Sequence, residues 1–226
     1  MGVSETYSQL HSLHNELRGW LVNNRYCRRG MTISWTEFTT QHRLPYAPSP
    51  VDVARLADSR QYSFQVNDGS LIQLYYEFEA DGETLRWANL LYCASGNLET
   101  EEGSEEEIEA LSMAYDAPDD VSTTTVPWVR IDYAPEHGSE MIHNECHMHV
   151  SNMPRTRMGL EGVPTPRQFV EAIMAWFYPE EYKRRHLDDS GDLVDVDRPE
   201  KVNEPSHACR DEMRARMRVL HLRAMS

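Results

Sequence analysis

Apolar residues near the start of the chain recur every three or four positions, the spacing that places side chains on one face of a helix. They are Tyr7, Leu10, Leu13, Leu17, Trp20 and Leu21. Ser4 precedes them and is a suitable N-cap residue. The pattern therefore predicts an amphipathic helix over Ser4–Asn24.

A second helical pattern begins at Thr165, near the other end of the chain. Thr165 and Gln168 have the spacing of a capping box, and Pro166 stands at the first helical position. The apolar residues that follow share one helical face, and Pro179 is placed to end the helix. We predict a helix over Thr165–Tyr178.

Between the two helical patterns, polar and apolar residues alternate, which is typical of strands with one buried face. Candidate strands lie at Met31–Phe38, Tyr62–Val66, Leu71–Glu79, Leu85–Cys93, Val126–Tyr133 and Glu145–Val150. Turn signals at 67–69 and 81–82 separate neighbouring strands, and Ser49-Pro50 starts a short helix to Ala57. The pattern predicts an α+β fold, in which an antiparallel sheet of about five strands packs against an N-terminal and a C-terminal helix.

The chain has 226 residues, enough for one domain with appendages. We predict a single α+β domain over residues 1–185 with an acidic insertion at 97–123, then a linker at 186–205 and a basic helix at 206–226. The formal net charge is −15, but ten acidic and no basic residues lie in 99–120, which leaves −5 for the rest. This charge argues against a general nucleic-acid coat or a binder of anionic membranes, although it allows a local basic groove.

The cysteines indicate a reducing compartment. They are Cys27, Cys93, Cys146 and Cys209, widely spaced and without a Cys-x-x-Cys pair, so we expect free thiols. The N-terminal residues contain no apolar signal region, and the longest apolar run, 172–178, is too short to cross a bilayer. We therefore expect a cytoplasmic protein that does not bind membranes.

Four of the ten histidines fall within thirteen consecutive positions: His137, His143, His147 and His149. Side chains alternate along a strand, so Glu145, His147 and His149 would share one face of the strand Glu145–Val150. The opposite face is apolar and includes Cys146, which is therefore not expected to act as a nucleophile. We expect the histidine face to be polar and open to solvent or to a cleft.

The preceding strand carries its own polar face, and pairing of the two strands would bring both polar faces together. The candidate catalytic residues are His143, His147 and Asp132, and the candidate anion-binding residues are Arg130, Arg155 and Arg157. The candidate metal ligands are His147, His149 and His143, with Asp132 as an alternative third ligand.

Three interpretations of this set remain open. In the first, the carboxylate orients an imidazole and the arginines hold a phosphate, which suits metal-free acid–base cleavage of a phosphodiester. In the second, the histidines bind a divalent cation such as zinc, although there is no cysteine pair and no HExxH motif. In the third, the histidines only stabilise the sheet. The chain has no Walker A loop, GxGxxG or GxSxG, and the pattern itself requires no cofactor.

Three segments within roughly residues 55–182 carry a family resemblance. They are 60–78 (Arg60-Gln61-Tyr62 to Tyr76-Glu77-Phe78), 130–133 (Arg130-Ile131-Asp132-Tyr133) and 143–178 (His143 through Arg157 and Pro164-Thr165-Pro166 to Phe177-Tyr178). Together they resemble a prokaryotic family of unknown function, family 2290. The family's recurrent polar positions are Arg130, Asp132, His143, His147 and Arg157. The chain departs from the family pattern at Asn144, where a proline is expected, and His149 is an addition of this chain.

The Arg-x-Asp and His-x-x-x-His arrangement is also similar, more distantly, to TumE-type toxins of toxin–antitoxin pairs. These resemblances imply a bacterial or archaeal protein from a mobile or anti-phage defence locus. Two functions fit this setting. One is a toxin-like effector, most simply a nuclease that acts through the candidate residues on nucleic acid. The other is a non-catalytic accessory subunit, whose neighbour-encoded protein partner binds the acidic segment 99–120 or the tail helix 206–226.

Overall fold

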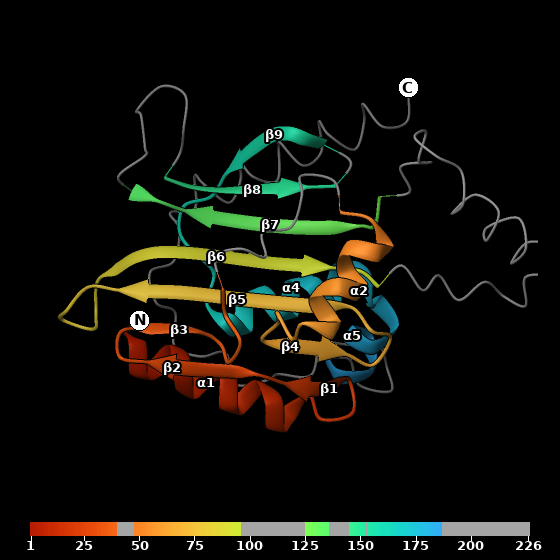
Figure 1. Cartoon of the computed structure of the whole chain (residues 1–226), viewed down its shortest axis with the longest axis horizontal. Coiled ribbons are helices and arrows are strands. Elements are labelled where there is room, and N and C mark those ends of the chain that lie inside the picture. The colour runs from red at the N-terminus through yellow and green to blue at the C-terminus, as the bar shows by residue number, and fades with distance from the viewer. Residues whose placement is uncertain (40–47, 96–124, 136–144, 152, 187–226) are drawn as a thin grey trace, which may run out of the picture. The chain divides into compact units, whose positions relative to one another are not determined.

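A computed structural model describes residues 1–39, 48–95, 125–135, 145–151 and 153–186, with the backbone alone at 153–156 (Figure 1). The acidic insertion predicted at 97–123, the basic helix predicted at 206–226 and all but the first residue of the predicted linker lie outside these ranges. The chain divides into two compact units, residues 1–177 and a second that begins at Tyr178.

The first unit is built on a nine-stranded sheet, and the named strands pair antiparallel throughout. The strands are β1 (Leu21–Asn24), β2 (Tyr26–Arg29), β3 (Thr32–Trp35), β4 (Phe64–Val66), β5 (Leu71–Phe78), β6 (Leu85–Cys93), β7 (Trp128–Tyr133), β8 (Cys146–Val150) and β9 (Met153–Gly159). Their order is β1-β4-β5-β6-β7-β8-β9, and the β2–β3 hairpin joins the sheet through β3, which pairs with β5. From β5 to β9, each strand pairs with the next one in the chain.

Helices α1 (Val3–Glu16) and α4 (Pro166–Phe177) cover one face of this sheet. Four buried side chains of α4 face the sheet: Phe169, Val170, Ile173 and Met174. The ring of Tyr92 on β6 lies 4.5 Å from that of Phe177, and the hydroxyl of Tyr76 on β5 donates to the carbonyl of Pro164. Arg167 of α4 pairs with Glu16 of α1 at 2.7 Å, which ties the two helices together. The main core therefore lies between the sheet and these two helices.

Helix α2 (Pro50–Asp58) packs on the opposite face, in front of the sheet in the view of Figure 1. Ser49 and Asp52 form a capping box at its start. Its buried side chains belong to a cluster formed with the ends of three strands: Val53, Leu56, Tyr62, Leu71, Cys93, Val126 and Trp128. Further along the same face, burial decreases and polar side chains replace the apolar ones. This less covered part of the face holds the candidate site.

The α+β class and the six predicted strand regions are confirmed, but the sheet has nine strands where we expected about five. The predicted helix Ser4–Asn24 is wrong in its last third, because α1 ends at Glu16 and the chain enters strand β1 at Leu21. Gly19 adopts a left-handed backbone conformation (φ 98°), which a helix does not accommodate. Trp20 and Leu21 are buried nonetheless, so apolar spacing alone did not reveal the end of the helix.

Strands β2 and β9 and helix α5 (Pro179–His186) were also not predicted. Pro179 ends α4, as expected, but it also occupies the first turn of α5, the position in which proline is compatible with a helix. Within α5, Glu181 pairs with Arg184 and Arg185. In the part of the chain that the structure describes, no helix has both the length and the apolar character needed to cross a membrane.

Candidate functional site

The pairing of β7 with β8 brings the candidate residues of two strands together. Asp132 lies directly opposite His147, and Arg130 lies directly opposite His149. Because alternate residues of a strand point to the same face, all four side chains project from the same face of the sheet. The convergence predicted from the sequence is therefore present for these four residues. Together with Asn89 of the neighbouring strand β6, we call them the Asp–His cluster.

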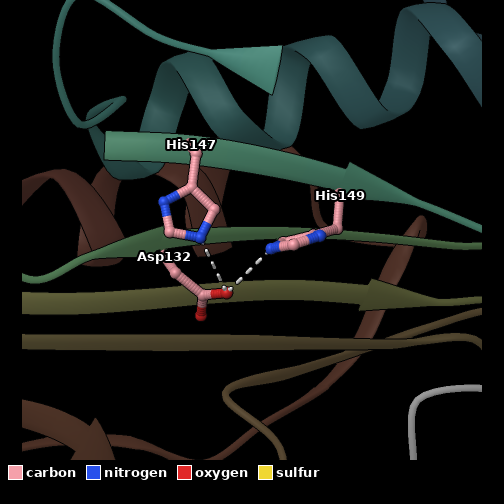
Figure 2. Close-up of side chains that lie close together, drawn as sticks. All are labelled: Asp132, His147 and His149. Carbon is pink, nitrogen blue, oxygen red and sulfur yellow. Dashed lines mark ion pairs between the residues drawn. The ribbon is translucent and has the colours of Figure 1, made fainter. Parts of the chain in front are cut away.

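The carboxylate of Asp132 is the centre of the cluster (Figure 2). Its Oδ2 atom lies 3.6 Å from Nε2 of His149 and 3.9 Å from Nε2 of His147. Figure 2 shows both imidazoles on β8 directed at this one oxygen. The two rings are 4.9 Å apart between centroids, at 77° to one another. Both imidazole–carboxylate distances are longer than a usual hydrogen bond, so the three side chains converge without direct hydrogen bonds between these atoms.

Two hydrogen bonds hold the Asp132 carboxylate in place. Nε of Arg130 donates to Oδ2 at 2.8 Å, and Nδ2 of Asn89 donates to Oδ1 at 2.5 Å. Asn89 comes from β6, where it lies opposite Asp132 in the strand register. The Arg130 guanidinium also lies 6.0 Å from the ring of Trp128, within the range of a cation–π contact. One carboxylate thus receives one donor at each oxygen from two different strands.

We expected the histidine face to be open to solvent or to a cleft, and His149 is not open to solvent. Its side chain is 3% exposed, against 15% for His147 and 21% for Asp132. Burial lowers the pKa of His149, and the nearby Arg130 guanidinium lowers it further, while Asp132 acts in the opposite direction. The lowered pKa favours the neutral form of His149 inside the cluster, and His147 forms the more accessible side.

The remaining candidates lie in β9 or outside the described residues. Arg157 is exposed. The positive charge of Arg157 helps to lower the pKa of His149, so Arg157 interacts electrostatically with the cluster. Gly159, two residues further on, lies opposite His147. The side chain of Arg155 and the whole of His143 fall outside the described part of the chain, so their predicted roles stay predictions.

Sequence reasoning missed Asn89 and the aromatic residues next to it. Asn89 is the one polar residue between Trp87 and Cys93 of β6, where it interrupts a run of apolar positions, and this interruption was the available signal. Trp87, two positions earlier and hence on the same face, is 43% exposed. Its ring lies 5.9 Å from that of Tyr75 on β5, edge to face. An aromatic pair made of the exposed Trp87 and the half-buried Tyr75 therefore lies beside the cluster on the same face of the sheet.

The cluster has the donor types of a cation site. Asp132, His147 and His149 each offer one ligand atom, and the three atoms lie within 4.8 Å of one another. Two imidazoles and one carboxylate are ligands that transition metals accept. The same groups can also orient a water molecule and transfer a proton, and the neighbouring guanidiniums can neutralise an anion. The arrangement therefore suits hydrolysis of an anionic substrate.

Fold and site together define an α+β protein with helices on both faces of an antiparallel sheet and an Asp–His cluster on the less covered face. The chain belongs to the family described as "Uncharacterized conserved protein (DUF2290)", whose sequence model matches residues 53–219. No curated protein and no solved structure matches the chain. The resemblance to family 2290 is thus confirmed, and the more distant similarity to TumE-type toxins stays a prediction.

We predict that Cys146 is chemically inert in the folded protein, although it is adjacent to His147. Burial raises the pKa of Cys146 to about 11, and the Asp132 charge adds to the effect. At pH 8 only about one thiol in a thousand is then ionised, and the thiolate is the reactive form. Iodoacetamide at pH 8, followed by peptide mapping, should leave Cys146 unlabelled in native protein and label it fully after denaturation. Labelling of native Cys146 as fast as the half-buried Cys27 would contradict this.

Proposed function

We propose that this protein is a cytoplasmic, prokaryotic nuclease that cleaves phosphodiester bonds at the Asp–His cluster and serves as an effector in anti-phage defence or a toxin–antitoxin system. The observation that carries the chemistry is the convergence of Asp132, His147 and His149 beside Arg130 on one face of the sheet. The cellular setting follows from the family resemblance, and the free thiols of Cys27, Cys93 and Cys146 fit a reducing compartment.

A contribution to the stability of the fold does not by itself explain the presence of such a cluster. A half-buried ion pair of the Arg130–Asp132 type contributes little net free energy of folding, because desolvation offsets most of the Coulomb attraction. Apolar residues of similar size would serve the sheet equally well at these positions. A buried histidine, a fixed carboxylate and two arginines within one patch are instead groups that are well suited to hydrolysis of a phosphodiester.

In this proposal the role of each side chain follows from its position in or beside the cluster. Asp132, His147 and His149 activate the attacking water, and His147, as the more accessible histidine, lies nearest the substrate. Arg130 and the exposed Arg157 neutralise the phosphate and the negative charge that grows on it in the transition state. Asn89 positions the carboxylate through its hydrogen bond to Oδ1.

The exposed Trp87 favours nucleic acid over a small phosphodiester. Exposed aromatic rings next to a positively charged site are the usual platform on which unpaired bases stack. Trp87 meets this description because it is 43% exposed and shares the face of the cluster through Asn89. A single-stranded substrate would place a base on Trp87 while a neighbouring phosphate reaches the arginines. The net charge of −15 limits binding to this local patch.

We predict that His147→Ala lowers the cleavage rate at least about 100-fold, because groups that transfer protons or activate water contribute on that scale. The measurement uses purified full-length chain, divalent cations and labelled single-stranded RNA and DNA oligonucleotides, with products resolved on gels. His11→Ala is the matched control, since His11 is an exposed histidine on α1. Far-UV circular dichroism and melting curves confirm that each variant is folded.

Full activity in folded His147→Ala would overturn the role of the cluster. The absence of any cleavage by the wild-type protein on RNA and DNA would overturn the nuclease proposal as a whole. A loss of activity in His11→Ala equal to that in His147→Ala would indicate a general effect of histidine removal and would also count against the site.

We predict that Trp87→Ala weakens binding of a single-stranded oligonucleotide about tenfold, since stacking of a base on an aromatic side chain is worth about 1–3 kcal/mol. Trp176, on α4 and 54% exposed, provides the control variant Trp176→Ala, which should bind as the wild type does. Fluorescence anisotropy at fixed salt measures both. Equal affinities for wild type and Trp87→Ala would exclude Trp87 as a contact.

A further inference from the structure

We propose that Asp132, His147 and His149 bind one divalent transition-metal cation, for which zinc is the best match. This cation site lies within the Asp–His cluster, and its part in cleavage rests on the function proposed above. Binding of the cation is independent of that function, because it is measured without any substrate.

The spacing of the donor atoms supports this inference. Nε2 of His149 and Nε2 of His147 lie 3.6 Å and 3.9 Å from the same oxygen of Asp132, and all three atoms fall within 4.8 Å. In a tetrahedral zinc site with bonds of about 2.0–2.1 Å, donor atoms are separated by about 3.3 Å. These separations, from 3.6 Å up to the 4.8 Å limit, exceed the tetrahedral value by about 0.3–1.5 Å. Small side-chain rotations would complete the coordination.

The strands that carry the ligands make the site rigid. His147 and His149 are alternate residues of β8, and Asp132 lies opposite His147 on β7. A His-x-His pair on a strand presents both imidazoles on one face, and the cross-strand neighbour adds the carboxylate from the same side. Figure 2 shows the resulting convergence on one carboxylate oxygen. No loop has to fold for these three donors to meet.

The hydrogen bonds around Asp132 are of the kind that supports a metal ligand. Asn89 donates to Oδ1 and Arg130 donates to Oδ2, so each oxygen of the carboxylate is held by one hydrogen bond. Each carboxylate oxygen has a second lone pair, which leaves capacity for a cation. Carboxylates that ligate metals are commonly oriented by such outer partners, and the loss of one partner typically lowers metal affinity about 10–100-fold.

Arg130 sets the charge of the occupied site. With Arg130, a divalent cation and Asp132 together, the local formal charge is positive, which suits a phosphate and disfavours a neutral substrate. The three protein ligands leave a fourth position for water, as in catalytic rather than structural zinc sites. With a cation held there by Asp132, His147 and His149, a water on it would ionise more easily and would supply the nucleophile for phosphorus; the proton of that water would pass to solvent, and the leaving ester oxygen would take a proton from water.

The test titrates ZnCl₂ into metal-free full-length protein by isothermal calorimetry. Because the chain has ten histidines, the informative quantity is the change in stoichiometry between variants. We expect His147→Gln and Asp132→Asn to bind one equivalent of zinc fewer than the wild type. His11→Gln and Asp58→Asn, at exposed positions of α1 and α2, should bind as the wild type does. Asn89→Ala keeps all three donors and should bind the same equivalent about 10–100-fold more weakly.

Unchanged stoichiometry and affinity in folded His147→Gln and Asp132→Asn would overturn the inference, as would the same loss in His11→Gln. If either ligand variant does not fold, Co²⁺ titrations of the wild type and Asn89→Ala, followed by visible absorption, decide: weaker Co²⁺ binding by Asn89→Ala supports the site, and equal affinity overturns it. Cleavage that persists undiminished in excess EDTA would overturn the cation's role and leave the nuclease proposal intact. Zinc binding at the cluster without cleavage of any nucleic acid would support the cation site and overturn the nuclease proposal.

Discussion

The register between β7 and β8 is the constraint on which the candidate site depends. A shift of one residue would turn His147 and His149 into the core beneath the sheet and bring Cys146 and Met148 to the polar face. The register is held by the apolar side of the same two strands, where Val129, Ile131 and Cys146 are buried. The packing of one face therefore determines which residues meet on the other, and the same logic extends across β6 to Asn89.

The two faces of the sheet differ in how far helices cover them and in which side chains they carry. One is covered by α1 and α4 and carries buried side chains such as Leu74, Tyr76 and Leu90. On the other face, a buried apolar cluster lies where α2 packs, around Leu71, Cys93 and Trp128. Beyond α2, the strands keep their pairing but no longer need apolar side chains on this face. This region can hold charged and polar groups at little expense to the core, which is why a site can exist there without weakening the fold.

Local signals in the sequence predicted much of this architecture. The start of α4 was recognisable because Thr165, Pro166 and Gln168 act within one turn, and β6 was predicted to the residue after the turn signal at 81–82. The end of α1 was not recognisable, because Trp20 and Leu21 remain buried after the helix gives way to a strand and so preserve the apolar spacing. The extra strands at the edges of the sheet have weak alternation of their own and depend on neighbours distant in the sequence.

The candidate site was predictable to a similar degree. Alternation along two strands correctly grouped Arg130, Asp132, His147 and His149, since that grouping needs only the strand period. Burial of His149 was not predictable, because it depends on how neighbouring strands and side chains cover β8. Asn89 was missed because it contacts Asp132 across 43 residues of sequence, a separation at which local patterns carry no information.

Direct occupancy of the cluster by a nucleic-acid phosphate tests the central claim most sharply. Protein with ¹⁵N-labelled histidine, loaded with zinc, is titrated with a non-cleavable phosphorothioate oligonucleotide, and imidazole resonances are assigned with single His→Gln variants. The account predicts saturable shifts of the His147 and His149 resonances and none of His11. Binding of the oligonucleotide with both cluster histidines unmoved, or with shifts confined to histidines elsewhere, would contradict it.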